Sequence, residues 1–149
     1  MVNFNRFWQK QEVRFGVIAL GIVLIDQIIK QLMAWLKPVW NLPLATIHLV
    51  QNTGAGFGIL KGQTFWLGVV SLLVAVGVIW YYHKIPNEKW PQVLFAVFLG
   101  GVIGNLIDRL FRGYVIDYMD LGFWPAFNIA DACISVAVVG LVIYYWKNP

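Results

Sequence analysis

The chain has 149 residues, of which 60% are hydrophobic and only 12% are charged. Soluble domains are about 25% charged, so this chain carries about half the charge that is usual for a soluble globule. Its high apolar content also excludes a disordered chain. An integral membrane protein is the class that fits, and at about 20 residues per membrane helix the length allows four or five spans in one domain. The net charge of +4 comes without a long basic cluster, so no nucleic-acid partner is expected.

The first apolar segment covers about 15–36 and is interrupted by Asp26 and Lys30. A charged, basic stretch precedes it, as in a secretory signal peptide, but no A-x-A-like cleavage site follows. We therefore predict an uncleaved first span.

Three further spans follow in the chain. The clearest lies between Lys61 and His83, where no residue is charged; the next opens at Pro91, and the last ends at Lys147. These limits predict spans at about 64–82, 92–112 and 128–146.

Two connections between spans are too polar to cross a membrane. In 37–62, Thr46 and His48 alternate with Ile47 and Leu49, a period of two that predicts a short β segment at the membrane surface. The 113–127 segment is interpreted as a second connection. The expected fold is an all-α integral membrane protein: a four-transmembrane-helix bundle with a small extracytoplasmic β segment between helices 1 and 2, in one domain over 1–149.

An even number of spans places both termini on one side. That side holds six basic residues, and the opposite side holds three once Lys30 and Arg109 are set aside as functional. Because cytoplasmic segments are enriched in Lys and Arg, both termini are expected in the cytoplasm.

The acidic residues are divided between the two membrane faces more unevenly than the basic residues. Glu12 and Glu88 fall on cytoplasmic segments, whereas the five aspartates fall toward the other face: Asp26, Asp108, Asp117, Asp120 and Asp131. An ionisable residue within a span costs about 2.5–3.5 kcal/mol on insertion scales, so each aspartate there needs a reason.

Asp117 and Asp131 are the strongest candidates for chemistry. Asp131 lies about one turn inside the fourth span, where it can also serve as a helix-terminal carboxylate that favours the helix dipole. If the chain returns so that the two carboxylates meet, they share one proton and can act as general acid and base on a peptide bond. Asp120 is the rival, interpreted as a solvated loop carboxylate.

Five short blocks resemble lipoprotein signal peptidase, also called signal peptidase II, and occur in that family's order. They are Asp26–Lys30, Asn52–Phe57, Gly104–Arg109, Val115–Asp117 and Phe127–Asp131. The resemblance extends from about residue 15 to 146. Gly56 stands where the family usually has Ala, and the stretch between Asp117 and Asp131 is short.

The resemblance implies an aspartyl endopeptidase of the bacterial cytoplasmic (inner) membrane. Its substrate is a prolipoprotein that carries diacylglyceryl on a cysteine, and it cleaves just before that cysteine without metal or cofactor. Asp117 and Asp131 are then the catalytic pair. Substrate-binding or supporting roles are implied for Asp26, Lys30, Asn52, Gly54, Asn105, Asp108, Arg109 and Asn128.

Some of these residues allow two interpretations. Asp26 and Lys30 are four residues apart and can form a structural ion pair on one helix face, or Lys30 can face the substrate. Arg109 can reach lipid headgroups, or donate hydrogen bonds to peptide carbonyls, which the resemblance favours.

Glycines 54, 56 and 58 either permit a close backbone approach or form an ordinary turn. The amides of Asn52 and Asn128 can hydrogen-bond a carboxylate or the peptide.

The main alternative is a small proton- or ion-coupled transporter, because intramembrane carboxylates also mark proton relays. The aspartates gather toward one face, whereas a relay needs steps on both sides. A non-catalytic scaffold does not require such costly residues. Membrane lipids are expected partners of the protein, which is expected to be a monomer.

Overall fold

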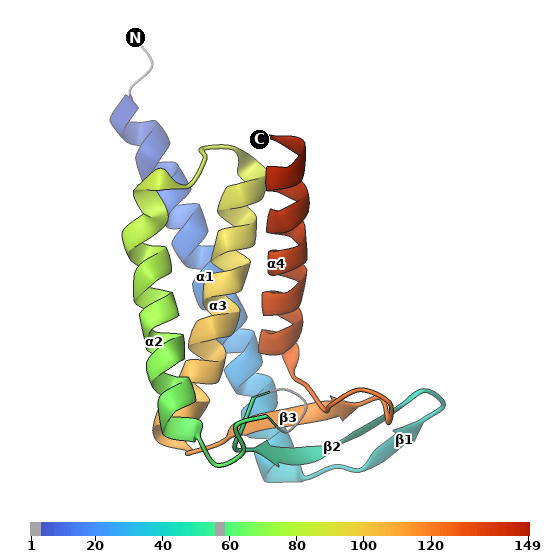
Figure 1. Cartoon of the computed structure of the whole chain (residues 1–149). Coiled ribbons are helices and arrows are strands. Elements are labelled where there is room, and N and C mark those ends of the chain that lie inside the picture. The colour runs from blue at the N-terminus through green and yellow to red at the C-terminus, as the bar shows by residue number, and fades with distance from the viewer. Residues whose placement is uncertain (1–3, 56–58) are drawn as a thin grey trace.

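The computed structural model describes residues 4–55 and 59–149. Its four long helices are α1 (Phe4–Leu36), α2 (Thr64–Tyr81), α3 (Lys89–Phe111) and α4 (Ile129–Lys147), as Figure 1 shows. Each is long and apolar enough to cross a membrane. The predicted bundle of four membrane helices is therefore confirmed.

Two helices begin earlier than predicted. α1 continues through the charged N-terminal stretch, which is helical from Phe4 onward. α3 starts at Lys89, so Pro91 lies in its first turn rather than before it. Proline is tolerated there because the first N–H groups of a helix have no intrahelical acceptor. A short 3₁₀ turn, η2 (Tyr82–Lys84), follows α2.

α3 is the central helix and packs against each of the other three. Glycines on α3 allow α1 and α4 to approach it closely. A Cβ at Gly100 would lie 2.8 Å from the Ala19 carbonyl oxygen of α1, and a Cβ at Gly101 would lie 2.6 Å from the Ala130 carbonyl oxygen of α4. Asn105 of α3 is thereby held between Lys30 of α1 and Asp131 of α4.

The predicted β segment between α1 and α2 is present as β1 (Trp40–Leu42) and β2 (Ala45–Asn52). A third strand, β3 (Val115–Asp120), comes from the segment interpreted as a plain connection. The sheet is antiparallel in the order β1-β2-β3, and its register pairs Val50 with Asp117. β3 forms because its apolar residues are buried, with Ile116 and Tyr118 packed on Met33 of α1.

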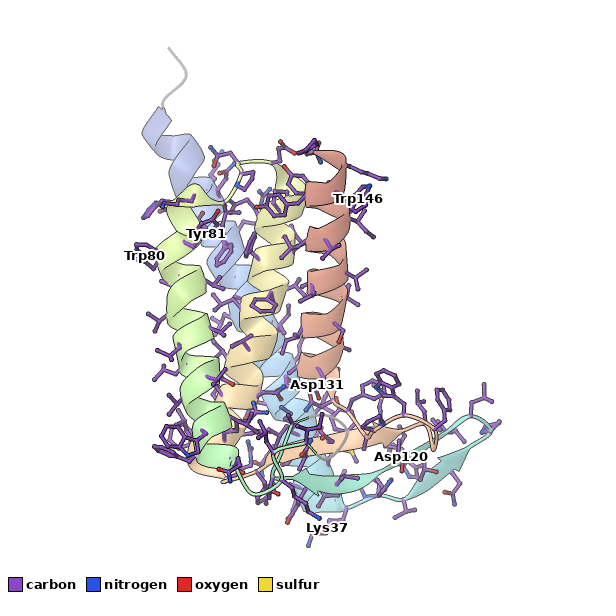
Figure 2. All side chains as sticks on the ribbon, viewed as in Figure 1. Lys37, Trp80, Tyr81, Asp120, Asp131 and Trp146 are labelled. Carbon is purple, nitrogen blue, oxygen red and sulfur yellow. The ribbon has the colours of Figure 1, made fainter. Side chains whose placement is uncertain are left out.

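Both chain termini lie at one end of the bundle, and the sheet projects sideways from the other end (Figure 1). Exposed Trp80 and Trp146 lie at the terminal end and Lys37 at the sheet end (Figure 2). Many large apolar side chains on the helices are also exposed, as expected for a surface that faces lipid. The sheet end is where the polar residues of the predicted site gather.

Candidate active site

The first turn of α4 is held by a capping box. Asn128 is the N-cap residue: its side-chain oxygen accepts the Asp131 backbone N–H at 2.9 Å, and Asp131 Oδ2 accepts the Asn128 backbone N–H at 3.1 Å. The helix-terminal role considered for Asp131 is thus present. It uses one carboxylate oxygen, and the other, Oδ1, accepts a hydrogen bond from Asn105 Nδ2 at 2.7 Å.

Asp117 lies on β3 and is 1% exposed. Each of its carboxylate oxygens accepts a side-chain amide N–H, from Asn52 at 2.9 Å and from Asn128 at 2.7 Å. Asn128 therefore contacts both Asp117 and Asp131. The structure brings together the two aspartates that the sequence suggested as a pair.

Burial and the neighbouring charge of Asp131 raise the pKa of Asp117 to about 7, against the hydrogen bonds from Asn52 and Asn128 that favour its ionised form. Asp117 can therefore hold a proton near neutral pH while a second carboxylate lies close by. Two adjacent carboxylates in different protonation states are the requirement for acid–base work on a peptide bond.

Two adjoining cavities open beside the aspartates. One, of about 230 Å³, is lined by Asp117, and the other, of about 180 Å³, is lined by Asp131 and Arg109. Both share a wall formed by Asn52, Gly54, Ala55, Pro125 and Ala126. Figure 2 shows Asp131 where α4 meets the sheet. Both aspartates accordingly line cavities near the sheet.

A buried ionic cluster lies behind the aspartates. Lys30 Nζ is 2.8 Å from Asp26 Oδ2 and 3.0 Å from Asp108 Oδ2, and all three side chains are 0% exposed. Arg112 forms a further ion pair with Asp108. The predicted contact between Asp26 and Lys30 thus extends to a second acid on α3.

Each acid of this cluster also holds the backbone next to one of the paired aspartates. Asp108 Oδ2 accepts the N–H of Ile116 at 3.0 Å, directly before Asp117. Asp26 Oδ1 accepts the N–H of Ala130 at 3.1 Å, directly before Asp131. The cluster therefore fixes β3 and the start of α4 relative to α1 and α3.

Arg109 lies against the second cavity. Its Nη1 donates to Ser71 Oγ of α2 at 3.3 Å, and its buried Nε has no hydrogen-bond partner among the described residues. The guanidinium is half-buried beside the cavity that contains Asp131, rather than extended from the end of α3. The guanidinium therefore belongs to the lining of this cavity.

The position of Gly54 leaves no room for a side chain. A Cβ there would lie 2.8 Å from the carbonyl oxygen of Ile59, and its own N–H donates to Asn52 Oδ1 at 2.9 Å. This hydrogen bond orients the Asn52 amide so that its NH₂ group reaches Asp117. Gly56 and Gly58 lie outside the described residues.

Asp120 is separate from the paired aspartates, further out along the sheet (Figure 2). The N–H of Gly122 and the side chain of His48, 3.1 Å away, lower the pKa of Asp120. Across residues 4–55 and 59–149, no group of three or more His, Cys, Asp or Glu side chains could hold a metal ion.

Four contributing residues were missed in the sequence. Gln27 donates to Asp108, Arg112 pairs with Asp108, Ser71 holds Arg109, and the Tyr118 hydroxyl accepts the Ile129 N–H at the start of α4. A spacing of four between Asp108 and Arg112 was a detectable signal. The contacts of Ser71 and Tyr118 link distant segments and left no local pattern.

Comparisons with known proteins identify a family for the chain. A model of the family described as signal peptidase (SPase) II matches residues 18–147. Proteins named lipoprotein signal peptidase from Halothermothrix orenii and Caldanaerobacter subterraneus are 36% and 41% identical to the chain, over 89% and 85% of its length and 94% and 90% of theirs.

Two solved structures, both described as bacterial membrane enzymes, superpose with TM-scores of 0.82 and 0.79. They are 27% and 26% identical to this chain; each match covers 89% of it, and 87% and 92% of the two solved chains. With a family model that matches most of its length, the chain is a peptidase that belongs to the signal peptidase II family.

Proposed function

We propose that this protein removes the signal peptide from prolipoproteins that already carry diacylglyceryl on a cysteine, and that it cleaves just before that cysteine. Asp117 and Asp131 are the catalytic pair. The observation that carries the proposal is the bridge through Asn128, which contacts both carboxylates beside two adjoining cavities.

In the first step, the ionised carboxylate of Asp131 takes a proton from a water molecule, and the water oxygen attacks the scissile carbonyl carbon. Asp117, protonated near neutral pH, donates a hydrogen bond to the carbonyl oxygen and stabilises the negative charge that develops there. The product of this step is a tetrahedral intermediate.

In the second step, the intermediate collapses and the carbon–nitrogen bond breaks. The amine of the lipidated cysteine takes the proton that Asp131 holds, and the signal peptide leaves with a new carboxyl end. Both aspartates then return to their starting protonation states, so the reaction consumes one water molecule and needs no other reactant.

The residues around the cavities position the peptide. Arg109 lines the cavity that Asp131 also lines, where its guanidinium can hydrogen-bond a peptide carbonyl. The backbone at Gly54 and Ala55 forms a wall of both cavities, and an extended peptide can lie along it.

The proposed setting is the bacterial cytoplasmic membrane, with the whole chain as one peptidase domain that acts as a monomer. Both termini lie in the cytoplasm, and the sheet and the aspartates lie at the opposite face. A lipid-anchored substrate presents its cleavage site at that membrane surface, which is the level of Asp131 at the start of α4.

The direct test is cleavage of a diacylglyceryl-modified lipobox peptide by the purified protein and by Asp117→Asn and Asp131→Asn. Each variant is expected to lose at least about 100-fold in kcat, because general acid–base catalysis contributes about 10²–10⁴-fold. Asp120→Asn is the matched control: it removes a carboxylate from the same strand, away from the pair, and should cleave at the wild-type rate.

Full activity in either Asp117→Asn or Asp131→Asn would contradict the assignment of the pair. Equal cleavage of the unmodified peptide would contradict the proposed substrate. If the protein cleaves neither peptide but carries protons across vesicle membranes, the transporter alternative replaces this proposal.

A further inference from the structure

Lys30 is wholly buried and has no hydrogen available for a substrate. An ammonium group has three N–H bonds, and Nζ has three acceptors: Asp26 Oδ2 at 2.8 Å, Asp108 Oδ2 at 3.0 Å and Asn105 Oδ1 at 2.9 Å. Any effect of Lys30 on the reaction must therefore pass through one of these three partners.

The contact with Asn105 decides how the amide of that residue is oriented. Asn105 Oδ1 accepts from Lys30 and also from Asn128 Nδ2 at 3.2 Å, so the NH₂ group must point the other way. It donates to Asp131 Oδ1 at 2.7 Å. In the reversed orientation, the NH₂ group would face the ammonium and the oxygen would face the carboxylate, which are two repulsive contacts.

This orientation favours one protonation state of Asp131. A hydrogen-bond donor aimed at a carboxylate stabilises the ionised form. Asp131 Oδ2 accepts a second N–H, from the Asn128 backbone, at the N-terminus of α4, where the helix dipole also favours negative charge.

We infer that Lys30 is a positioning residue: it fixes the amide of Asn105 so that the NH₂ group faces Asp131, and it thereby keeps Asp131 as the ionised member of the pair. The inference rests on the proposed function of that pair. The ion pair with Asp26 that the spacing predicted is present, and the inference adds to it a contact with Asn105 that acts on Asp131.

Other charged or titratable groups also influence the protonation of Asp131, so their charges must stay constant in the test. The charged or titratable neighbours from α1, α3, β3 and α4 are Asp26, Asp108, Arg109, Arg112, Asp117, Tyr118 and Cys133.

A charge-balanced variant isolates the effect of the contact between Lys30 and Asn105. Asp26, Asp108, Lys30 and Arg112 carry two negative and two positive charges, so Asp26→Asn with Lys30→Met leaves one of each. Asn at position 26 keeps an oxygen that can accept the Ala130 N–H. Asp26→Asn alone is the matched control, because it retains the contact between Lys30 and Asn105.

The double variant is expected to move the acid limb of the kcat–pH profile to higher pH by about one unit, so that kcat on that limb falls about tenfold at a given pH. KM should be unchanged because Lys30 does not touch the peptide. Asp26→Asn alone keeps the contact and removes one negative charge, so its acid limb should stay in place or move to lower pH, opposite to the double variant. A folded double variant with the wild-type acid limb would overturn the inference.

A second measurement does not need activity. In an Asp117→Asn background, infrared spectroscopy follows protonation of the Asp131 carboxyl group, and the midpoint should also move up by about one unit when the double change is added. An unmoved midpoint overturns the inference even if the peptidase proposal holds. A wild type that cleaves no lipopeptide contradicts the proposed function and leaves the infrared result to decide the role of Lys30.

If the double variant does not fold, Asn105→Leu replaces it. Leu removes the donor to Asp131 and leaves both ion pairs of Lys30 in place. The same displacement of the acid limb and the infrared midpoint supports the step from Asn105 to Asp131 through which Lys30 acts, and a limb and midpoint equal to those of the wild type overturn the inference.

Discussion

Asn128 shows how much one side chain contributes to this site. Its oxygen caps α4, and its Nδ2 lies 2.7 Å from Asp117 Oδ1 and 3.2 Å from both Asn105 Oδ1 and the Ile116 carbonyl oxygen. An NH₂ group has two hydrogens for these three acceptors. Asp117 thus has one shared donor, on Oδ1, and the Asn52 amide on Oδ2, whereas neither of the two donors to Asp131 is shared in this way. The asymmetry agrees with a protonated Asp117 and an ionised Asp131.

The raised pKa of Asp117, which burial and the charge of Asp131 set at about 7, predicts a pH-dependent stability. Between about pH 4 and pH 7 the folded protein holds a proton that the unfolded chain has lost. Stability should therefore fall as pH rises through this window, by up to about 1.4 kcal/mol per pH unit from this group.

Thermal unfolding in detergent across this pH range measures the effect. Asp117→Asn should flatten the dependence, whereas Asp120→Asn should leave this window unchanged because Asp120 has a lowered pKa. Identical slopes for wild type and Asp117→Asn would contradict a proton on Asp117.

At the scale of elements, α3 brings the site together because it lies close to both α1 and α4. At Gly104, a Cβ would lie 2.6 Å from Asp26 Oδ2 and 3.4 Å from the Ala130 Cβ. The glycine thus leaves room for the carboxylate that holds the start of α4 through the Ala130 N–H.

We predict that Gly104→Ala displaces Asp26, destabilises the protein by about 1–3 kcal/mol through overpacking and lowers kcat at least tenfold. Gly77→Ala is the control, since a Cβ at Gly77 meets nothing within 4 Å. Thermal unfolding and lipopeptide cleavage measure both effects. Equal stability and activity of the two variants would show that the contact at Gly104 is not needed.

The helices could be predicted from the sequence, whereas β3 could not. Membrane spans need long apolar runs, which are visible locally in 64–82 and 128–146. β3 has six residues and becomes a strand by pairing with β2, whose residues lie far away in the chain. Its burial against Met33 of α1 is likewise a tertiary effect.

The same limit applies to the site. Asp117 and Asp131 could be proposed because carboxylates are costly near a membrane, and the spacing of Asp26 and Lys30 indicated their contact. The third partner of Lys30, Asn105, is 75 residues away, and the Ala130 N–H that Asp26 accepts is 104 residues away. No sequence pattern at helical or strand spacing encodes such contacts.

For the whole molecule, the arrangement predicts which face each end occupies. The termini lie at one end of the bundle and the sheet at the other, so the proposed orientation puts Leu44 outside and Lys147 in the cytoplasm. Leu44 is 85% exposed, and the one native cysteine can be removed as Cys133→Ser.

In that background, a membrane-impermeant maleimide added to intact cells or spheroplasts should label Leu44→Cys and not Lys147→Cys. After the membrane is permeabilised, both should react. Labelling of Lys147→Cys alone in intact cells would reverse the orientation and move the aspartates to the cytoplasmic face.

The cap of α4 has a consequence for biosynthesis. Asn128 and Asp131, at the start of α4, are synthesised after Asn52, Asn105 and Asp117. Until the first turn of that helix forms, Asp117 has neither its bridging amide nor its partner carboxylate. A nascent chain with only the first three helices in the membrane therefore lacks the proposed catalytic pair, and a product truncated before α4 is expected to be inert. Under the proposed function, peptidase activity is therefore expected only after α4 has inserted into the membrane.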